Sequence, residues 1–268
     1  MTGQTLIYKK RKINYHLQGD VSKKTIVFIH GNSLSSKTFA EQFNGIKNIP
    51  LLAIDLPGHG LSERPAEPEK TYSILGYIEV LKFVLAELKI SDFILAGHSL
   101  GGHIALEASN ELLGLKGLVI FGTPPLGMPP EMDKAFLPNA AMAFLFQDQI
   151  TDIEINILSE ALTNNENTEK LKSEIRITDG NARSFLAASI PQGLFKNEIQ
   201  LTENLSIPIA ILHGGGDALI SKEYINGLTI PTLWKKKIQI INNAEHCPQI
   251  EQPSAFNTIL TDFFNSIL

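Results

Sequence analysis

Short apolar runs alternate with longer amphipathic stretches along most of the chain. Thr25–His30 and Leu51–Asp55 are almost continuously apolar, as expected for strands buried on both faces of a parallel sheet. Ser73–Leu88 has apolar residues spaced three and four apart and therefore predicts an amphipathic helix. The alternation predicts an α/β fold built on a doubly wound, mostly parallel sheet. Further strands are predicted at Ile13–Gln18, Asp92–Ala96, Leu118–Gly122, Ile207–His213 and Lys237–Ile241, and further helices at Leu100–Asn110 and Ser254–Ile267.

One long segment interrupts this alternation. Between Pro124 and Leu205 the apolar residues follow helical spacing and no strand is predicted. Such a segment is too long for a simple connecting loop. We therefore expect a helical cap, residues 125–205, inserted into a core made of residues 1–124 and 206–268. Because open α/β sheets bind ligands at the carboxyl ends of their strands, the cap is expected to cover that edge.

Composition narrows the classes of partner. The 268 residues are 43% hydrophobic and 19% charged, which is typical of a globular protein. A net charge of −5 supplies no field that attracts nucleic acid, so no nucleic-acid partner is expected. The longest apolar run, Ala140–Phe146, is far short of the ~20 residues that a membrane span needs. With no signal-peptide pattern and Cys247 as its one cysteine, the chain is expected to be cytoplasmic and to act on small molecules.

A glycine-flanked serine lies between a predicted strand and a predicted helix. Residues Gly97–Gly101 read Gly-His-Ser-Leu-Gly and match the G-x-S-x-G pattern of a nucleophile elbow, in which a tight turn lifts a serine above the sheet edge. The glycines are needed because such a turn leaves little room for side chains. Ser99 is therefore the candidate nucleophile.

A serine hydroxyl is a weak nucleophile and needs a neighbouring base. The histidines that follow the elbow are His103, His213 and His246. His103 lies in a predicted helix and is expected to pack there, whereas His213 ends a predicted strand and is expected to form local hydrogen bonds. His246 lies in a polar loop after the last predicted strand, where it can reach the elbow, and is the candidate base.

The acid that orients the base is expected after a late strand, in the chain order serine, acid, histidine. Gly214–Asp217 follows the predicted strand Ile207–His213 and ends in a carboxylate. Glu223 and Glu245 are alternatives, but the first falls on a predicted helix and the second lies beside the base. Asp217 is therefore the candidate acid.

Two backbone N–H groups are candidates for an oxyanion hole. One is that of Leu100, directly after the nucleophile, and the other is that of Asn32 in the loop after the strand Thr25–Ile29. Such donors stabilise the negative charge that develops on a carbonyl oxygen during acyl transfer. We expect the Asn32 side-chain amide to be free to contact the substrate.

Other polar motifs do not indicate a second chemistry. The turn Asp55–Ser62 contains His59, but its Pro and Gly residues after a strand are typical of a structural turn held by Asp55 and His59 hydrogen bonds. No cluster of His, Cys and carboxylate residues has the spacing of metal ligands, so no metal is expected. No glycine-rich phosphate loop follows a strand, so no nucleotide cofactor is expected either.

Together these motifs resemble the α/β-hydrolase superfamily over essentially the whole chain. The resemblance implies the α/β-hydrolase fold and a Ser-His-Asp triad. Haloalkane dehalogenases share a similar His-Gly-Asn loop, but they and epoxide hydrolases use an aspartate nucleophile, so Ser99 argues against both activities. The motifs that carry the resemblance are His30-Gly31-Asn32, Asp55–Ser62, the elbow, Asp217 and the His246 loop.

A closer similarity is to the metal-free N-acyl homoserine lactone lactonases of this fold. Two matching stretches, Gly122–Pro125 and Thr178–Arg183, lie beside or inside the predicted cap, where substrate is selected. The chain departs from that family at His98, where an aromatic residue can stand, at Asp217, where a glutamate can stand, and in a cap without Tyr or Trp. The other matching stretches are His30–Ser33, Leu100–Ile104, Leu233-Trp234 and Asn243–His246.

The resemblance implies a quorum-quenching lactonase that opens the ring through an acyl-enzyme, with His246 taking the Ser99 proton and later activating water. Substrate contacts are expected from His98 beside the nucleophile. Aromatic residues in and around Ala140–Phe146 would line an acyl tunnel, or alternatively form the core of the cap itself. These residues are Phe136, Phe144, Phe185 and Phe195.

Three other functions stay open at this point. A general carboxylesterase would use the same residues. A carbon–carbon bond hydrolase of ring-cleavage products would need polar cap groups for a dicarboxylic substrate, and the arginines of the cap are Arg176 and Arg183 alone. A non-catalytic ligand receptor would not need to keep Ser99, Asp217 and His246 together with an oxyanion loop.

Overall fold

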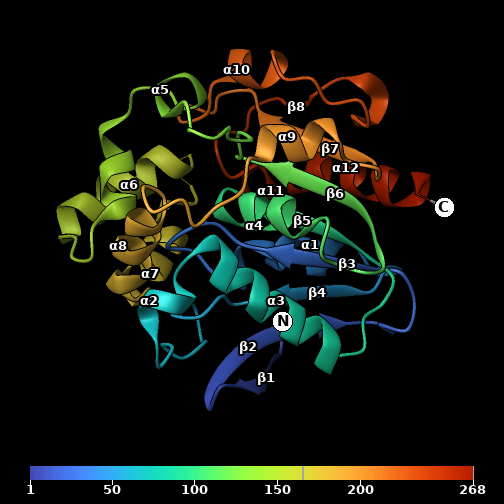
Figure 1. Cartoon of the computed structure of the whole chain (residues 1–268), viewed down its shortest axis with the longest axis horizontal. Coiled ribbons are helices and arrows are strands. Elements are labelled where there is room, and N and C mark those ends of the chain that lie inside the picture. Colours follow the sequence, from blue (N-terminus) through green and yellow to red (C-terminus); the bar gives the residue numbers. More distant parts are fainter. Residues whose placement is uncertain (165, 268) are drawn as a thin grey trace.

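The computed structural model describes residues 1–164 and 166–267. Within these residues eight strands form one sheet, in the order β1-β2-β4-β3-β5-β6-β7-β8 (Figure 1). β1 pairs antiparallel with β2 and β2 with β4, whereas all the other neighbouring strands are parallel. The strands are β1 (Gly3–Tyr8), β2 (Arg11–Gln18), β3 (Thr25–Ile29), β4 (Leu51–Ile54), β5 (Phe93–His98), β6 (Leu115–Phe121), β7 (Ile209–Gly214) and β8 (Gln239–Ile241).

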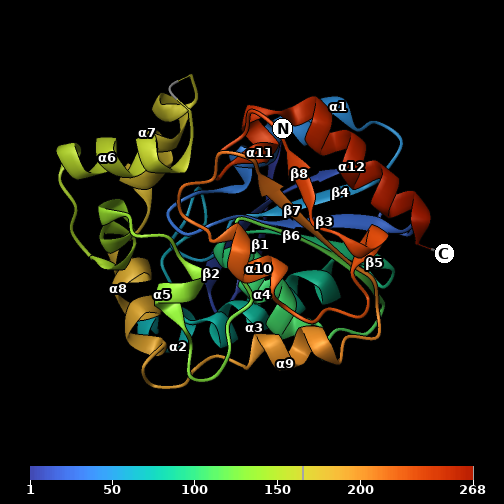
Figure 2. The same ribbon diagram turned by 90° about the horizontal axis from the view of Figure 1, so that it is seen from above.

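Helices cover both faces of the sheet. Figure 2 shows α1, α11 and α12 over one face and α3, α4 and α9 over the other. No helix of the described residues is both long enough and apolar enough to cross a membrane. The helices are η1 (Ser36–Phe39), α1 (Ala40–Gly45), α2 (Pro68–Thr71), α3 (Ile74–Glu87), α4 (Leu100–Ala108), α5 (Met132–Ala135), η2 (Ala140–Phe146), α6 (Asp152–Leu162), α7 (Thr168–Ile177), α8 (Gly180–Ser189), α9 (Glu198–Glu203), α10 (Lys222–Asn226), η3 (Trp234–Lys236), α11 (Pro248–Glu251) and α12 (Pro253–Ser266).

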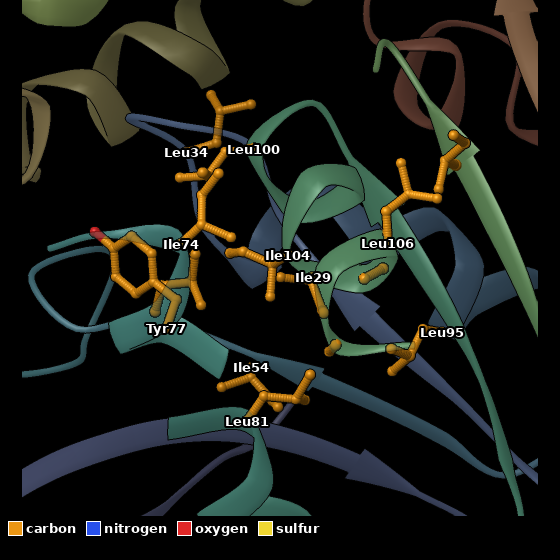
Figure 3. Close-up of a cluster of buried hydrophobic side chains, with 14 of the residues drawn as sticks. Ile29, Leu34, Ile54, Ile74, Tyr77, Leu81, Leu95, Leu100, Ile104 and Leu106 are labelled. Carbon is orange, nitrogen blue, oxygen red and sulfur yellow. The ribbon is translucent and has the colours of Figure 1, made fainter. Parts of the chain in front are cut away.

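The central strands bury side chains on both faces. Ile26 and Phe28 of β3 join an apolar cluster that includes Phe256 of α12, whereas Val27 and Ile29 join the cluster on the other face. Figure 3 shows side chains of β3, β4 and β5 in that second cluster against those of α3 and α4. Burial on two faces is the reason for the continuous apolar runs in the sequence, and the predicted α/β sheet is confirmed.

The edge strand β1 is not predicted by the apolar pattern. Most of its side chains are exposed or only half-buried, so no strong alternation marks it. It forms a hairpin with β2 through Lys9 and Lys10, whose φ angles are +46° and +67°. β5 also runs two residues beyond its predicted end and includes His98, because the strand continues directly into the elbow.

Between β6 and β7 the described residues form helices and loops but no strand. In Figure 1, α6, α7 and α8 lie beyond the carboxyl ends of the parallel strands. α9, in contrast, packs against α4 beside the sheet. A helical insertion over the carboxyl edge is therefore present, while the cap boundaries at residues 125 and 205 stay a prediction.

α6 begins with a capping box in which Thr151 and Glu154 bond each other's backbone N–H, a strong helix-start signal.

Candidate active site

The serine elbow joins β5 to α4. Ser99 has φ +50° and ψ −116°, an uncommon conformation for a residue with a side chain, and its N–H donates to the Phe121 carbonyl at 2.9 Å. A Cβ on Gly97 would lie 2.3 Å from the carbonyl oxygen of Gly101, and a Cβ on Gly101 would lie 2.1 Å from that of Ile29. The turn therefore requires both glycines, and it holds Ser99 at the N-terminus of α4.

His246 and Asp217 form a buried pair. His246 Nδ1 lies 3.0 Å from Asp217 Oδ2, and Oδ1 accepts the N–H groups of Leu219 at 2.9 Å and Ile220 at 3.2 Å. Burial acts to raise the pKa of Asp217, but the His246 ring and the N–H donors outweigh it and lower the pKa. Since an ionised carboxylate only accepts hydrogen bonds, His246 Nδ1 carries the proton and Nε2 is left to accept one in the neutral ring.

The end of β6 brings this pair beside the elbow. Gly122 has φ +59°, and a Cβ there would lie 2.8 Å from His246 Cε1. Thr123 Oγ1 donates to the Ser99 carbonyl at 2.9 Å. Ser99 Oγ has no hydrogen-bond partner among the described residues, as is common before a substrate tightens the serine–histidine contact.

His98 does not have the predicted substrate contact. It is fully buried, its ring stacks on Phe121 at 5.2 Å, and it is not among the residues that line the pocket at Ser99. Burial and then the nearby His246 ring lower its pKa to about 3, so it is neutral at physiological pH. Its Nε2 lies 2.9 Å from the His246 carbonyl oxygen. His98 therefore supports the loop that carries His246 and does not line the pocket.

The two residues that carry the candidate oxyanion donors line the same pocket. Asn32 and Leu100 both line it, and neither backbone N–H has an acceptor among the described residues. The expectation that the Asn32 side chain is free is wrong, because Nδ2 donates to the Leu145 carbonyl at 2.9 Å and Oδ1 accepts from Ser33 Oγ at 3.2 Å. The side chain thus ties the loop after β3 to η2, which leaves the backbone N–H for the site.

The predicted structural turn after β4 is confirmed. Asp55 accepts the N–H groups of Ser36 at 2.8 Å and Leu61 at 2.9 Å, which fixes the turn to the loop after β3. His59 Nδ1 bonds the Pro57 carbonyl at 3.0 Å. Burial lowers the pKa of His59 to about 3, so this histidine is neutral at physiological pH.

A mostly apolar pocket opens at Ser99. Phe136 and Phe195 line it as predicted, but Phe144 of η2 and Phe185 of α8 do not. Both are partly buried and pack against the hydrophobic core instead. A stripe of aromatic residues in a helical segment cannot be divided by sequence alone into core and pocket. The apolar lining consists of Ile74, Leu100, Leu126, Met132, Phe136, Met142, Leu145, Phe146, Leu186, Ile190 and Phe195.

Two further histidines differ from the sequence-based expectation. His103 is not merely packed, since it lines the pocket and its Nδ1 lies 2.9 Å from both carboxylate oxygens of Glu198. His213 lacks the expected local hydrogen bond, because its buried Nδ1 has no partner among the described residues. The contact of His103 with Glu198 joins positions 95 residues apart, and no local pattern in the sequence signals it.

Comparison with known proteins decides the family. The sequence model of the alpha/beta hydrolase family matches residues 26–259. The chain belongs to this family. The matched range contains the elbow, Asp217 and His246, and the predicted α/β-hydrolase fold is confirmed.

Individual relatives include esterases and a lactonase. A Mycoplasma genitalium protein provisionally named esterase/lipase 1 is 27% identical over 262 residues, covering 90% of this chain and 91% of that protein. A mutant of the N-acyl homoserine lactonase AidH, in complex with N-hexanoyl homoserine lactone, has a TM-score of 0.93 at 28% identity, covering 98% of this chain and 97% of that one. The esterase RhEst1 from Rhodococcus sp. ECU1013 has a TM-score of 0.82 at 21% identity over the whole of both chains and shows the shared fold. The chain is thus an alpha/beta hydrolase that is similar to esterases and to a lactonase.

Proposed function

We propose that the protein is a serine hydrolase in which Ser99 is the nucleophile, His246 the base and Asp217 the acid that orients the base. The strained elbow and the hydrogen bond of 3.0 Å between His246 and Asp217 support these roles. The carboxylate fixes the proton on Nδ1, so Nε2 can take the proton of Ser99 Oγ. This is the arrangement that a weakly acidic hydroxyl needs to become a nucleophile at neutral pH.

In the proposed reaction, Ser99 Oγ adds to the substrate carbonyl carbon and its proton passes to His246 Nε2. The backbone N–H groups of Asn32 and Leu100 stabilise the resulting oxyanion, each by about 2.7–4 kcal/mol. The carbon–oxygen bond then breaks, and the leaving oxygen takes the proton from His246 to become a hydroxyl. His246 next removes a proton from a water molecule, which adds to the acyl-enzyme and releases the acid and the free serine.

The favoured substrate is an N-acyl homoserine lactone, whose opened alcohol stays attached to the acyl group. The observation that carries this choice is the likeness to the lactonase AidH over 98% of this chain at 28% identity, since it includes the inserted helices as well as the sheet. The apolar lining of the pocket at Ser99 suits an acyl chain. A general carboxylesterase is the second candidate, favoured by the Mycoplasma genitalium relative.

The deciding experiment compares lactones with simple esters. Ring-opening of N-butanoyl, N-hexanoyl and N-dodecanoyl homoserine lactone is measured beside hydrolysis of p-nitrophenyl acetate and butyrate. Lactone turnover well above ester turnover supports the lactonase, whereas ester cleavage without lactone opening leaves the carboxylesterase.

The same assays test the nucleophile. Ser99→Ala is expected to lose about 10³- to 10⁶-fold in kcat and all labelling by a fluorophosphonate probe. Ser109→Ala is the matched control, because Ser109 Oγ bonds only the Leu106 carbonyl at the end of α4. A Ser99→Ala protein that keeps its activity, or equal losses in both variants, would refute the assignment.

A further inference from the structure

The pocket at Ser99 has one ionisable pair in its wall. Apart from Ser99 and Asn32, the described residues that line it are apolar except for His103 of α4 and Glu198 of α9. Burying a polar group in an apolar wall costs free energy unless it is hydrogen-bonded. The pair meets that condition internally, since His103 Nδ1 lies 2.9 Å from both Glu198 oxygens.

The pair is rigidly held. The Glu198 side chain is 1% exposed and the His103 side chain 12% exposed. Glu198 Oε2 also accepts the Leu126 N–H at 2.8 Å, and the Glu198 N–H donates to the Leu126 carbonyl at 2.8 Å. Glu198 is therefore held through both its carboxylate and its backbone N–H. Its carboxylate in turn holds the His103 imidazole in place.

The second ring nitrogen of His103, Nε2, does not take part in the contact with Glu198. Nδ1 carries a proton because it faces a carboxylate, so Nε2 is an acceptor in the neutral ring. Nε2 has no hydrogen-bond partner among the described residues, yet it is not among the polar atoms sealed from solvent. A pair that served only to join α4 to α9 would not need an open acceptor on the pocket wall.

His103 also lies at a useful distance from the nucleophile. It follows Ser99 by four residues on α4, which is one helical turn and a rise of about 6 Å. Helical side chains lean toward the N-terminus and cover the preceding turn. This direction is consistent with the pocket lining, which includes both His103 and Ser99.

We propose that His103 Nε2 binds the substrate by accepting a hydrogen bond from an N–H or O–H group close to the scissile carbonyl, and that the pair selects substrates with such a donor. The inference rests on the proposed hydrolase function and makes it more specific. In an N-acyl homoserine lactone the amide N–H is two bonds from the lactone carbonyl carbon, so a single side chain can contact it while Ser99 attacks.

The buried Glu107 is consistent with this charge arrangement. It lies one turn beyond His103 on the same helix, and burial together with the nearby Glu198 raises its pKa to about 8. Glu107 is therefore protonated at neutral pH and does not compete with Glu198 as a charged partner for the imidazole.

The test uses two esters that differ only in the donor. Hexanoylglycine p-nitrophenyl ester carries an amide N–H, and 4-oxononanoic acid p-nitrophenyl ester has a CH₂ in its place. We expect the wild-type protein to favour the amide in kcat/KM by about 10- to 100-fold, the range for a hydrogen bond that leaves a polar group unpaired when lost. In His103→Leu this ratio is expected to fall to near 1.

Two further variants separate binding from packing. His103→Gln keeps an acceptor and is expected to retain part of the ratio, whereas Met132→Leu changes an apolar part of the same wall and should leave the ratio unchanged. A wild-type ratio near 1, or a ratio that survives in His103→Leu, would overturn the proposal. Since these substrates are esters, that result is distinct from a failure to open lactones, and a protein inactive on every ester and lactone would refute the hydrolase function itself.

Discussion

Histidines around the elbow differ in their hydrogen-bond partners because their surroundings differ. His98 and His59 are fully enclosed, and burial lowers the pKa of each to about 3. Burial also lowers the pKa of His30, whose ring bonds the Gly31 carbonyl and the Leu56 N–H. His246 differs from these three in its hydrogen bond to a carboxylate. Of these four, only His246 combines a fixed tautomer with a partner for the imidazolium that forms during proton transfer.

Asp217→Asn tests this pairing at the scale of one residue. The amide is nearly the same size but can donate to His246 Nδ1, which would move the ring proton to Nε2 and leave no acceptor for the Ser99 proton. We expect kcat to fall by about 10⁴-fold with little change in fold. Steady-state kinetics with circular dichroism measure both effects.

Asp262→Asn is the control for this substitution, because Asp262 is an exposed aspartate near Lys235. It should keep wild-type kinetics. A loss below about 10-fold in Asp217→Asn would be far smaller than removal of the orienting acid produces and would contradict the proposed role.

At the scale of elements, the central strands were predictable because burial on two faces leaves an apolar run. β3 is the clearest case, with every residue buried. β1 could not be predicted, because its exposed side chains follow no apolar pattern. The helical insertion was predictable from its length and spacing, but the packing of α9 against α4 was not, since it depends on contacts between distant segments.

The site was predictable where local chain geometry decides it. The elbow glycines, the turn before Asp217 and the loop of His246 are each visible as short patterns after strands. The prediction was wrong for His98, which a strand that runs up to the elbow buries, and for the Asn32 side chain, which the carbonyl of Leu145 occupies. It missed the His103–Glu198 pair because no sequence spacing encodes a contact between α4 and α9.

Arg183 of α8 links the inserted helices to the loop after β3, which carries the proposed oxyanion donor Asn32. It is buried, and its guanidinium donates to the carbonyls of Gln147 at 2.7 Å and Asp148 at 3.1 Å and to Ser33 Oγ at 3.5 Å. Arg183→Lys keeps the charge but cannot form this fork. We expect it to lower the free energy of unfolding by about 1–3 kcal/mol and kcat/KM by about 10-fold.

Arg176→Lys provides the matched comparison for urea unfolding and kinetics. Arg176 of α7 pairs with Asp152 at the surface, where the two side chains are 47% and 77% exposed, so the change should cost about 0–0.5 kcal/mol and leave kinetics intact. If both arginine variants behave alike, the fork of Arg183 does not support the oxyanion loop.

The whole molecule contains buried acids whose pKa values are displaced in opposite directions. Burial opposes the ionised forms of Asp55 and Asp217, yet hydrogen bonds and nearby histidines lower both pKa values. Their stabilising contribution is present above the unfolded-state pKa and is lost as pH falls through the folded-state value. Glu107 shifts in the other direction, because burial and the nearby Glu198 raise its pKa to about 8. Its two carboxyl oxygens also have no hydrogen-bond partner among the described residues.

Glu107 therefore makes the free energy of unfolding fall as the pH rises. Its pKa is 4.5 in the reference state and about 8 when folded, so between these values the folded protein holds a proton that the unfolded chain has released. Its contribution to the free energy of unfolding is complete below pH 4.5 and is lost progressively as pH rises to about 8. Over this range the free energy of unfolding falls by up to about 1.4 kcal/mol per pH unit. Glu107→Gln cannot ionise and should flatten this decline, which urea unfolding between pH 5 and 9 measures.

Glu111→Gln is a control with the opposite expectation, because hydrogen bonds from Lys196 and Lys82 outweigh the opposing effect of burial and lower the pKa of Glu111. A carboxylate of this kind is already ionised in both states above pH 5, so its removal should leave the alkaline slope unchanged and cost at most about 1 kcal/mol throughout. If Glu107→Gln and the wild type lose stability in parallel from pH 5 to 9, Glu107 is ionised in the folded protein. A second buried carboxylate charge would then lie near Glu198.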